Sequence, residues 1–149
     1  MPARHFADTN LLVYRYSSQD QDKRAIAARL LSSGECVISL QVVNEFCNVV
    51  RKKFPAQFLL IEPVLKAIQA DLPIAALHRE DTFSAVNIAQ RHGIPYYDAL
   101  ILACALRLGC QTVLSEDMQH GFVLDGKLTI VNPFILKVAQ SASGLTLTL

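Results

Sequence analysis

Short apolar runs alternate with longer helical segments along this chain, and this alternation constrains its fold most. The runs predicted to be strands are residues 5–8 (the end of a first strand), 36–38, 72–77, 112–114 and 128–131. Buried strands joined by helices are typical of parallel sheets. With 52% apolar and 18% charged residues, the composition also suits helices packed on both faces of a buried sheet. We therefore predict an α/β fold with a central sheet of four to five mainly parallel strands.

Capping residues divide the intervening segments into helices. Asp20 and Ser39 are good N-cap residues, Gly34 suits the end of a helix, and Pro55 suits a first turn. The predicted helices cover about residues 20–32, 40–53, 56–70, 80–91 and 99–108, the last capped by Asp98. The segment that follows the first strand is predicted to begin with a turn.

The length of 149 residues fits one domain. We assign residues 1–140 to that domain and residues 141–149 to a C-terminal tail, SASGLTLTL. The tail suits an edge strand, a partner-binding segment or a disordered end, and the sequence does not choose among them. The first ten residues lack the apolar stretch of a signal peptide, and no run of 18 apolar residues occurs. We therefore expect a cytoplasmic protein with no membrane partner.

Four acidic residues stand in separate stretches, each beside an apolar run. They are Asp8 in FADTN, Glu45 in VVNEF, Asp98 in PYYDALILACA and Asp117 in TVLSEDMQHG. In open parallel sheets, ligands bind at the carboxyl ends of the strands, and all four residues can reach that edge. A cluster of carboxylates repels itself unless a cation compensates the charge. Oxygen ligands suit Mg²⁺ or Mn²⁺, so the pattern predicts a divalent-metal site.

Each carboxylate also has a local interpretation. Asp98 alone suits a helix N-cap, Asp117 alone suits a turn, and Asp8 alone suits a turn stabilised by its own side chain. Glu45 is harder to explain in this way, because apolar residues surround it on a helix that looks largely buried, and Glu is rarely buried without a partner. Taken together, the four residues favour the metal site.

In order and spacing, FADTNLLVY, VVNEF, YYDALILACAL and TVLSEDMQHG resemble the acidic motifs of the PIN domain, and the chain looks most like VapC-type toxins of toxin–antitoxin pairs. The resemblance runs from Arg4 to about Phe134. It implies a three-layer α/β/α fold in which Asp8, Glu45, Asp98 and Asp117 are the catalytic, metal-binding carboxylates. It also implies that Asn10 and Ser115 support the site by hydrogen bonding. Glu116 is an alternative to Asp117 as the fourth carboxylate.

The same resemblance implies a function. PIN proteins are Mg²⁺- or Mn²⁺-dependent nucleases, and VapC members cut RNA, pair as dimers and are blocked by an antitoxin in the active-site groove. A bound metal can supply hydroxide near neutral pH and stabilise charge on the phosphate, and a carboxylate could instead orient the water as a general base. No histidine pair suggests attack by the RNA 2′-hydroxyl, so we predict 5′-phosphate and 3′-hydroxyl ends. Whether one or two metal ions act stays open.

Other functions fit the sequence less well. A haloacid-dehalogenase-like phosphatase needs D-x-D after the first strand, where this chain has Asp8-Thr9-Asn10, and a phosphoacceptor receiver domain needs an acidic pair and a late Lys. The non-enzymatic alternative is a PIN-domain RNA-binding or RNA-processing protein with weak or no catalysis. The net charge is only +1, so any RNA contact must come from local clusters. Residues 51–53, Arg-Lys-Lys, suit either RNA contact or the negative end of a helix dipole.

Overall fold

The computed structural model describes residues 3–135. The predicted tail, residues 141–149, lies outside this range. Within it the chain forms seven helices and a single sheet of six strands, in the order β3-β2-β1-β4-β6-β5. The strands are β1 (His5–Ala7), β2 (Cys36–Ser39), β3 (Ile74–Ala75), β4 (Thr112–Leu114), β5 (Val123–Leu124) and β6 (Leu128–Val131). All neighbouring pairs are parallel except β5 with β6.

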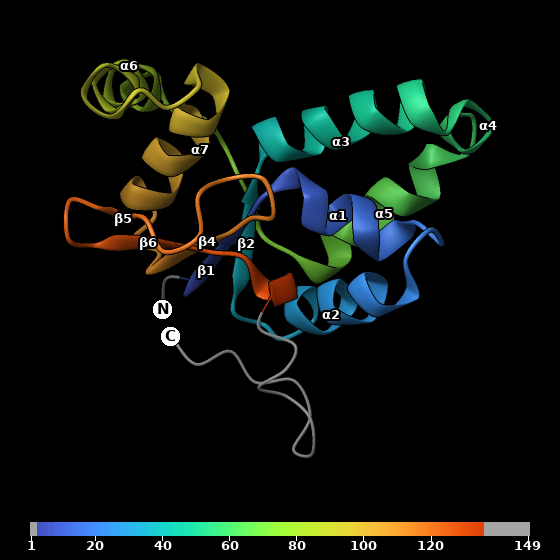
Figure 1. Ribbon diagram of the computed structural model, residues 1–149. Helices are drawn as coiled ribbons and strands as arrows, with labels where there is room; N and C mark the ends of the chain where they lie inside the picture. The colour runs from blue at the N-terminus through green and yellow to red at the C-terminus, as the bar shows by residue number, and fades with distance from the viewer. Residues whose placement is uncertain (1–2, 136–149) are drawn as a thin grey trace.

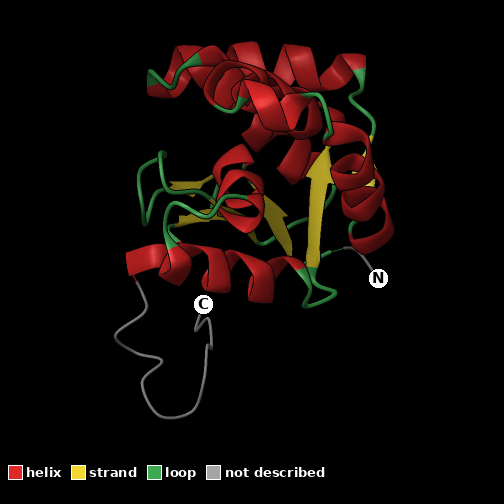
Figure 2. Cartoon of the chain, turned by 90° about the vertical axis from the view of Figure 1, so that its right-hand side faces the viewer, coloured by secondary structure: helices red, strands yellow, loops and turns green. Residues whose placement is uncertain are grey.

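Helices cover both faces of this sheet, which confirms the predicted α/β/α layers. Figure 1 shows α6 and α7 above the sheet and α2 below it, and Figure 2 shows the strands lying between helices on either side. The helices are α1 (Thr9–Tyr16), α2 (Gln21–Leu31), α3 (Leu40–Lys53), α4 (Pro55–Phe58), α5 (Ile61–Asp71), α6 (Arg79–His92) and α7 (Tyr96–Arg107). No helix in residues 3–135 combines the length and the apolar composition needed to cross a membrane.

The core lies where α7 passes between the sheet and α6. Residues 99–105 of α7 are all buried, and α7 packs against β4, β6 and α6. A helix surrounded in this way must be apolar on every side, which explains the run ALILACA. The strands below it, including Phe6, Val113 and Leu114, are fully buried. A packed core at this position fixes the ends of β1 and β4 relative to the start of α7.

Several predicted boundaries are confirmed, and their caps are present. The Asp20 side chain accepts a hydrogen bond from the Lys23 N–H, and Ser39 accepts one from the Val42 N–H. Gly93 ends α6 in the left-handed conformation at φ 66°, which an L side chain adopts only at a cost. These signals are local, so they could be recognised in the sequence.

Four predictions were wrong in detail. The predicted helix over residues 56–70 is two helices, because Pro63 has no N–H for the interior of a continuous helix. Asp98 does not cap α7, which begins two residues earlier after Pro95. The segment after β1 is the helix α1, with Asp8 at its N-cap. The sheet has one strand more than predicted among the described residues, the two-residue edge strand β5.

Candidate active site

The carboxyl ends of β1 and β4 lie side by side in the middle of the sheet. Parallel pairing aligns Ala7 with Leu114, so the next residues along the chain, Asp8 and Ser115, are neighbours. The Asp8 N–H donates to the Leu114 carbonyl oxygen at 2.9 Å. The Ser115 hydroxyl donates to Asp8 Oδ2 at 2.8 Å. Residues 107 positions apart in the sequence are thus joined at one sheet edge.

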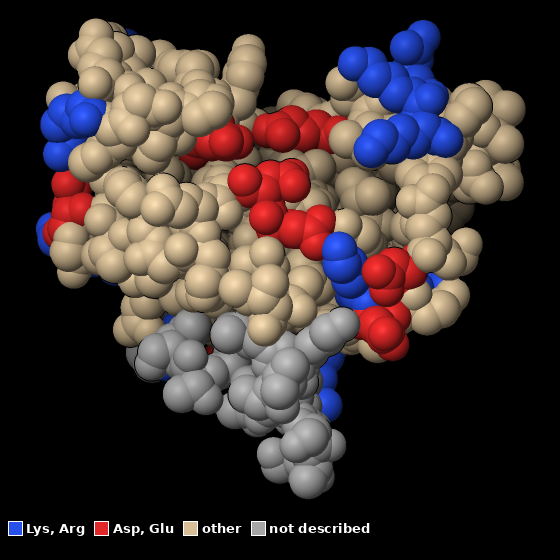
Figure 3. All heavy atoms as spheres, in the orientation of Figure 1, with Lys and Arg blue, Asp and Glu red and all other residues tan. Residues whose placement is uncertain are grey.

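All four predicted carboxylates line one cavity at this edge, with a volume of about 320 Å³. They come from four places in the chain: the end of β1, the middle of α3, the first turn of α7 and the loop after β4. In Figure 3, Asp and Glu side chains form a band across this face of the molecule. The described residues that complete the lining are Thr9, Asn10, Val13, Tyr14, Gln19, Val49, Lys53, Phe54 and Glu116. The fold therefore brings together residues that the sequence only suggested were close.

Asp8 is the most buried of the four, with 5% of its surface exposed. Burial raises its pKa to about 6, since a charged carboxylate is poorly solvated there. Hydrogen bonds from Ser115 and from the Thr9 N–H act in the opposite direction, while the charges of Glu45 and Asp98 raise the pKa further. The two carboxylates therefore act on Asp8 electrostatically, although they belong to other helices.

Glu45 is half-buried on α3 and is held from two sides. Gln41, one turn earlier, donates from Nε2 to Glu45 Oε1 at 2.6 Å and to the Tyr97 carbonyl oxygen at 3.0 Å. The Thr9 hydroxyl donates to Glu45 Oε2 at 3.4 Å. Gln41 is buried, so it fixes the carboxylate of Glu45 relative to the start of α7. Gln41 was not among the predicted site residues, although its spacing of four residues from Glu45 on a helix was a usable signal.

Asp98 is half-buried in the first turn of α7. Its pKa is raised, first by burial and then by the charge of Asp117. The amino-terminal end of a helix attracts negative charge, which favours a carboxylate in this turn without a capping hydrogen bond. The local interpretation as an N-cap was wrong, and the proximity to Asp117 agrees with the clustered arrangement.

Asp117 and Glu116 both line the cavity, but they differ in their partners. Glu116 forms an ion pair with Lys23 and accepts a hydrogen bond from the Tyr14 hydroxyl. Asp117 is exposed and accepts a hydrogen bond from Asn10 Nδ2 at 3.3 Å. The charge of Glu116 is thus balanced by an ammonium group of the protein, whereas Asp117 faces Asp98 and adds to the uncompensated negative charge.

Ser115 and Asn10 organise the loop that carries these two acids. While its hydroxyl donates to Asp8, Ser115 Oγ accepts from the N–H groups of Asp117 and Met118, each at 3.2 Å. Asn10 Oδ1 accepts from the Glu116 N–H at 3.3 Å. Both residues therefore hold the loop against the end of β1.

The donor chemistry of the cavity fits a hard divalent cation, since carboxylate oxygens dominate it. As the side chains stand, no three His, Cys, Asp or Glu residues in the described part of the chain are grouped tightly enough to hold a metal ion. The pKa values of Asp8 and Asp98 are raised, mainly by burial and further by the charges of neighbouring carboxylates. A bound cation would favour the ionised form of both side chains.

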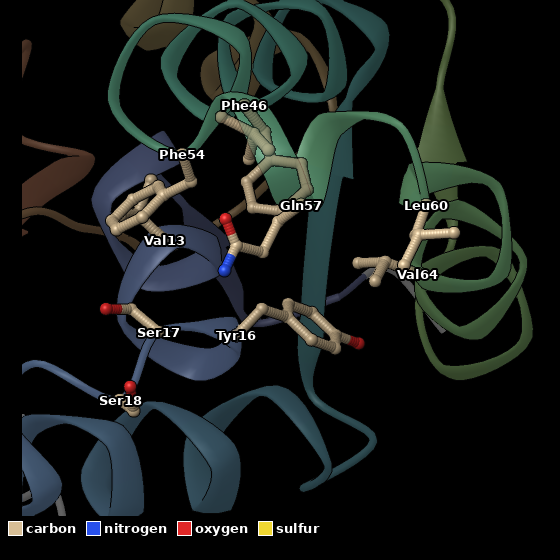
Figure 4. A pocket seen from close by; sticks show the side chains of 10 residues that line it. Val13, Tyr16, Ser17, Ser18, Phe46, Phe54, Gln57, Leu60 and Val64 are labelled. Carbon is tan, nitrogen blue, oxygen red and sulfur yellow. The ribbon is translucent and has the colours of Figure 1, made fainter.

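An apolar pocket adjoins this cavity and shares Val13 and Phe54 with it. It also measures about 320 Å³ and lies among α1, α3, α4 and α5. Figure 4 shows Phe46, Phe54, Gln57, Tyr16, Leu60 and Val64 around it. Leu60 is 74% exposed at its edge. Exposed apolar surface beside a polar cavity is typical of a surface that binds a partner.

The chain is similar to one protein family and to several solved structures. A family model described as PIN domain matches residues 6–121. A toxin–antitoxin complex from Klebsiella pneumoniae has a TM-score of 0.66 at 20% identity, covering 87% of this chain and 97% of that chain. FitAcB from Neisseria gonorrhoeae has a TM-score of 0.65 at 20% identity, covering 87% and 98%.

VapC20 from Mycobacterium tuberculosis, described as a sarcin–ricin loop cleaving toxin, has a TM-score of 0.63 at 16% identity, covering 76% of this chain and 89% of that chain. No curated protein sequence matches the chain. At these identities the likeness to solved structures shows a shared fold.

Proposed function

The chain belongs to the PIN domain family, and from this premise we propose that it is a Mg²⁺- or Mn²⁺-dependent endoribonuclease, the toxin of a toxin–antitoxin pair. One observation carries the proposal: Asp8, Glu45, Asp98 and Asp117 line a single cavity. Burial, with a smaller contribution from the charges of Glu45 and Asp98, raises the pKa of Asp8 there to about 6. The similarity of the fold to VapC20 and to toxin–antitoxin complexes supports the choice of RNA and of a toxin.

The four carboxylates would hold the metal, and residues of the chain keep them in place. Ser115 and the Thr9 N–H hold Asp8, Gln41 holds Glu45, and Asn10 holds Asp117. A divalent ion, when bound, supplies charge that polarises the phosphate and lowers the pKa of water. A carboxylate of the cavity that is not occupied by the ion can orient the attacking water as a general base.

When water attacks the phosphorus and the 3′ oxygen leaves, the P–O3′ bond breaks. One fragment then ends in a 3′-hydroxyl and the other begins with a 5′-phosphate. The competing route, through the RNA 2′-hydroxyl, generally uses a pair of acid and base groups such as two histidines. Among the described residues, the cavity lining contains no histidine. We therefore expect 5′-phosphate and 3′-hydroxyl ends, and products with cyclic phosphate ends would rule out this mechanism.

A cleavage assay with the purified protein tests the proposal. RNA cleavage should require Mg²⁺ or Mn²⁺, stop with EDTA, and fall about 100-fold or more in Asp8→Ala and Asp98→Ala. Asp22→Ala is the matched control, because Asp22 is exposed on α2 outside the cavity. If the wild-type protein binds RNA but does not cut it with either metal, the alternative of an RNA-binding PIN domain without catalysis is correct.

The apolar pocket supports the proposal that an inhibitory partner protein binds beside the acidic cavity. A partner that inserts an apolar side chain beside Phe54 also lies next to the carboxylates, where an Arg could pair with them in place of the metal. Leu60→Asp should weaken binding of the protein encoded by an adjacent small reading frame at least tenfold and leave RNA cleavage intact, because Leu60 lies outside the acidic cavity. Equal binding to the wild-type protein and the variant, measured by calorimetry, would exclude this surface as the binding site of the partner.

We also propose that the protein forms a homodimer, and the molar mass measured by light scattering tests this.

A further inference from the structure

We propose that Lys53 binds a phosphate of the RNA strand next to the scissile phosphate, and so places the strand across the acidic cavity. This inference rests on the proposed nuclease function and adds a residue that positions the substrate. Lys53 belongs to the basic segment at the C-terminal end of α3, which consists of Arg51, Lys52 and Lys53. The carboxylate site by itself gives this segment no function.

One face of α3 points into the cavity. Glu45, Val49 and Lys53 are spaced four residues apart, and all three line it. Gln41 precedes them at the same spacing and holds Glu45. The rise of a helix separates Glu45 from Lys53 by about 12 Å along its axis. Lys53 therefore lies towards the C-terminal end of this face of α3, which places it for a phosphate next to the one held at Glu45.

The charge of the cavity favours such a contact. A polyanionic strand is repelled by the carboxylates, and the net charge of +1 gives no general attraction. Lys53 is the one Lys or Arg among the described residues that line the cavity. It is exposed and has no ion-pair partner within residues 3–135, whereas nearby Lys23 is paired with Glu116. Figure 3 shows basic side chains over the C-terminal end of α3, beside the acidic band.

A structural role for the basic segment makes a different prediction. Cations in the last turn of a helix stabilise it through the helix dipole, and Arg51, Lys52 and Lys53 all stand in that turn. Arg51 and Lys52 do not line the cavity. If the dipole were the whole explanation, Lys52 and Lys53 would be equivalent, because they have the same charge and neighbouring positions.

The experiment compares Lys53→Met with Lys52→Met on a short RNA whose cut site has been mapped with the wild-type protein. In a series of substrates, one phosphate at a time on either side of the cut is replaced by an uncharged methylphosphonate. We expect the methylphosphonate at one position, the phosphate that Lys53 contacts, to raise KM about fivefold for the wild-type protein and for Lys52→Met. This factor corresponds to the upper end of the free energies measured for exposed charge pairs. Lys53→Met should raise KM by a similar factor on unmodified RNA and then lose the sensitivity to that replacement.

Binding in EDTA gives a second readout. The slope of log affinity against log salt should fall by about 0.7 in Lys53→Met, the value for one phosphate contact on a single strand, and stay unchanged in Lys52→Met. Equal behaviour of the two variants, or an undiminished methylphosphonate effect in Lys53→Met, overturns the role of Lys53 while metal-dependent cleavage stands. If the wild-type protein cuts no RNA at all, the proposed function and this inference both fail.

Discussion

At the scale of single residues, the site depends on carboxylates whose burial is unfavourable without a cation. Asp8 shows this most clearly, because burial outweighs the hydrogen bonds that it accepts and raises its pKa from 3.8 to about 6. A group with a raised acid pKa favours the protonated form in the folded protein. In the metal-free protein its ionisation therefore lowers stability above about pH 6, and this cost disappears as the pH falls towards 3.8.

This leads to a prediction for Asp8→Asn. The variant keeps the shape of the side chain without the charge, so at pH 8 in EDTA it should be more stable than the wild-type protein, by at most about 3 kcal/mol. The difference should shrink as the pH is lowered to 5. Urea unfolding at the two pH values measures it. A difference that does not change with pH would mean that Asp8 is not destabilised by its charge.

A second prediction separates Glu116 from Asp117. Glu116 is balanced by Lys23, so Glu116→Gln should lower RNA cleavage less than tenfold, and loss of this partly exposed ion pair should cost under about 1 kcal/mol. Asp117→Asn should lower cleavage about 100-fold, because it removes one of the four unpaired carboxylates. Single-turnover rates at saturating Mn²⁺ measure both effects. The reverse order would identify Glu116 as the fourth carboxylate.

At the scale of helices and strands, several of the signals that the sequence carries locally predicted the structure correctly, and an edge strand that depends on a distant partner was not predicted. The caps at Asp20 and Ser39 were predicted because a single side chain makes each of them. Pro63 and Pro95 were signals of the same kind that were overlooked, and they moved two helix boundaries. The edge strand β5 could not be predicted, since two residues have no period and their pairing with β6 decides the conformation.

An ion pair between the exposed Arg107 of α7 and the buried Asp81 of α6 gives a third prediction. Arg107 donates to both carboxylate oxygens of Asp81, which is 2% exposed, and to the Ala76 carbonyl oxygen. Burial alone would raise the pKa of Asp81, but the hydrogen bonds from Arg107 and from the His78 N–H lower it. The pair thus stabilises the fold at pH values above the pKa of an Asp in the unfolded chain. This contribution is lost as the pH falls through the lowered pKa of Asp81 in the folded protein.

Removing the cation should therefore be costly. Arg107→Met leaves a buried carboxylate without its partner, and we expect the free energy of unfolding at pH 7 to fall by about 3–5 kcal/mol. The control is Arg91→Met, which breaks the exposed pair with Asp125 and should cost under about 1 kcal/mol. Equal losses in the two variants, measured by chemical denaturation, would show that burial of the Asp81 pair has no effect on stability.

At the scale of the whole molecule, the site follows from the strand order. The strand β1 lies between β2 and β4. From β1 the chain continues to β2 and β3 on one side of β1, and it then crosses to β4 on the other side. This change of direction opens a crevice at the carboxyl ends of the strands. Asp8 and Ser115 meet there, and α3 and α7 bring Glu45 and Asp98 to the same cavity. The order of the acidic motifs allowed this clustering to be predicted. The pairing of Glu116 with Lys23 depends on a contact between α2 and the loop after β4, which no local pattern encodes.

The central claim is that the four carboxylates act as one metal site, and Mn²⁺ binding tests it most directly. Titration calorimetry should detect Mn²⁺ binding to the wild-type protein, and each of Asp8→Asn, Glu45→Gln, Asp98→Asn and Asp117→Asn should weaken it about tenfold or more. Asp22→Asn should bind Mn²⁺ as the wild-type protein does. Wild-type affinity in all four cavity variants would show that these carboxylates do not form a shared metal site.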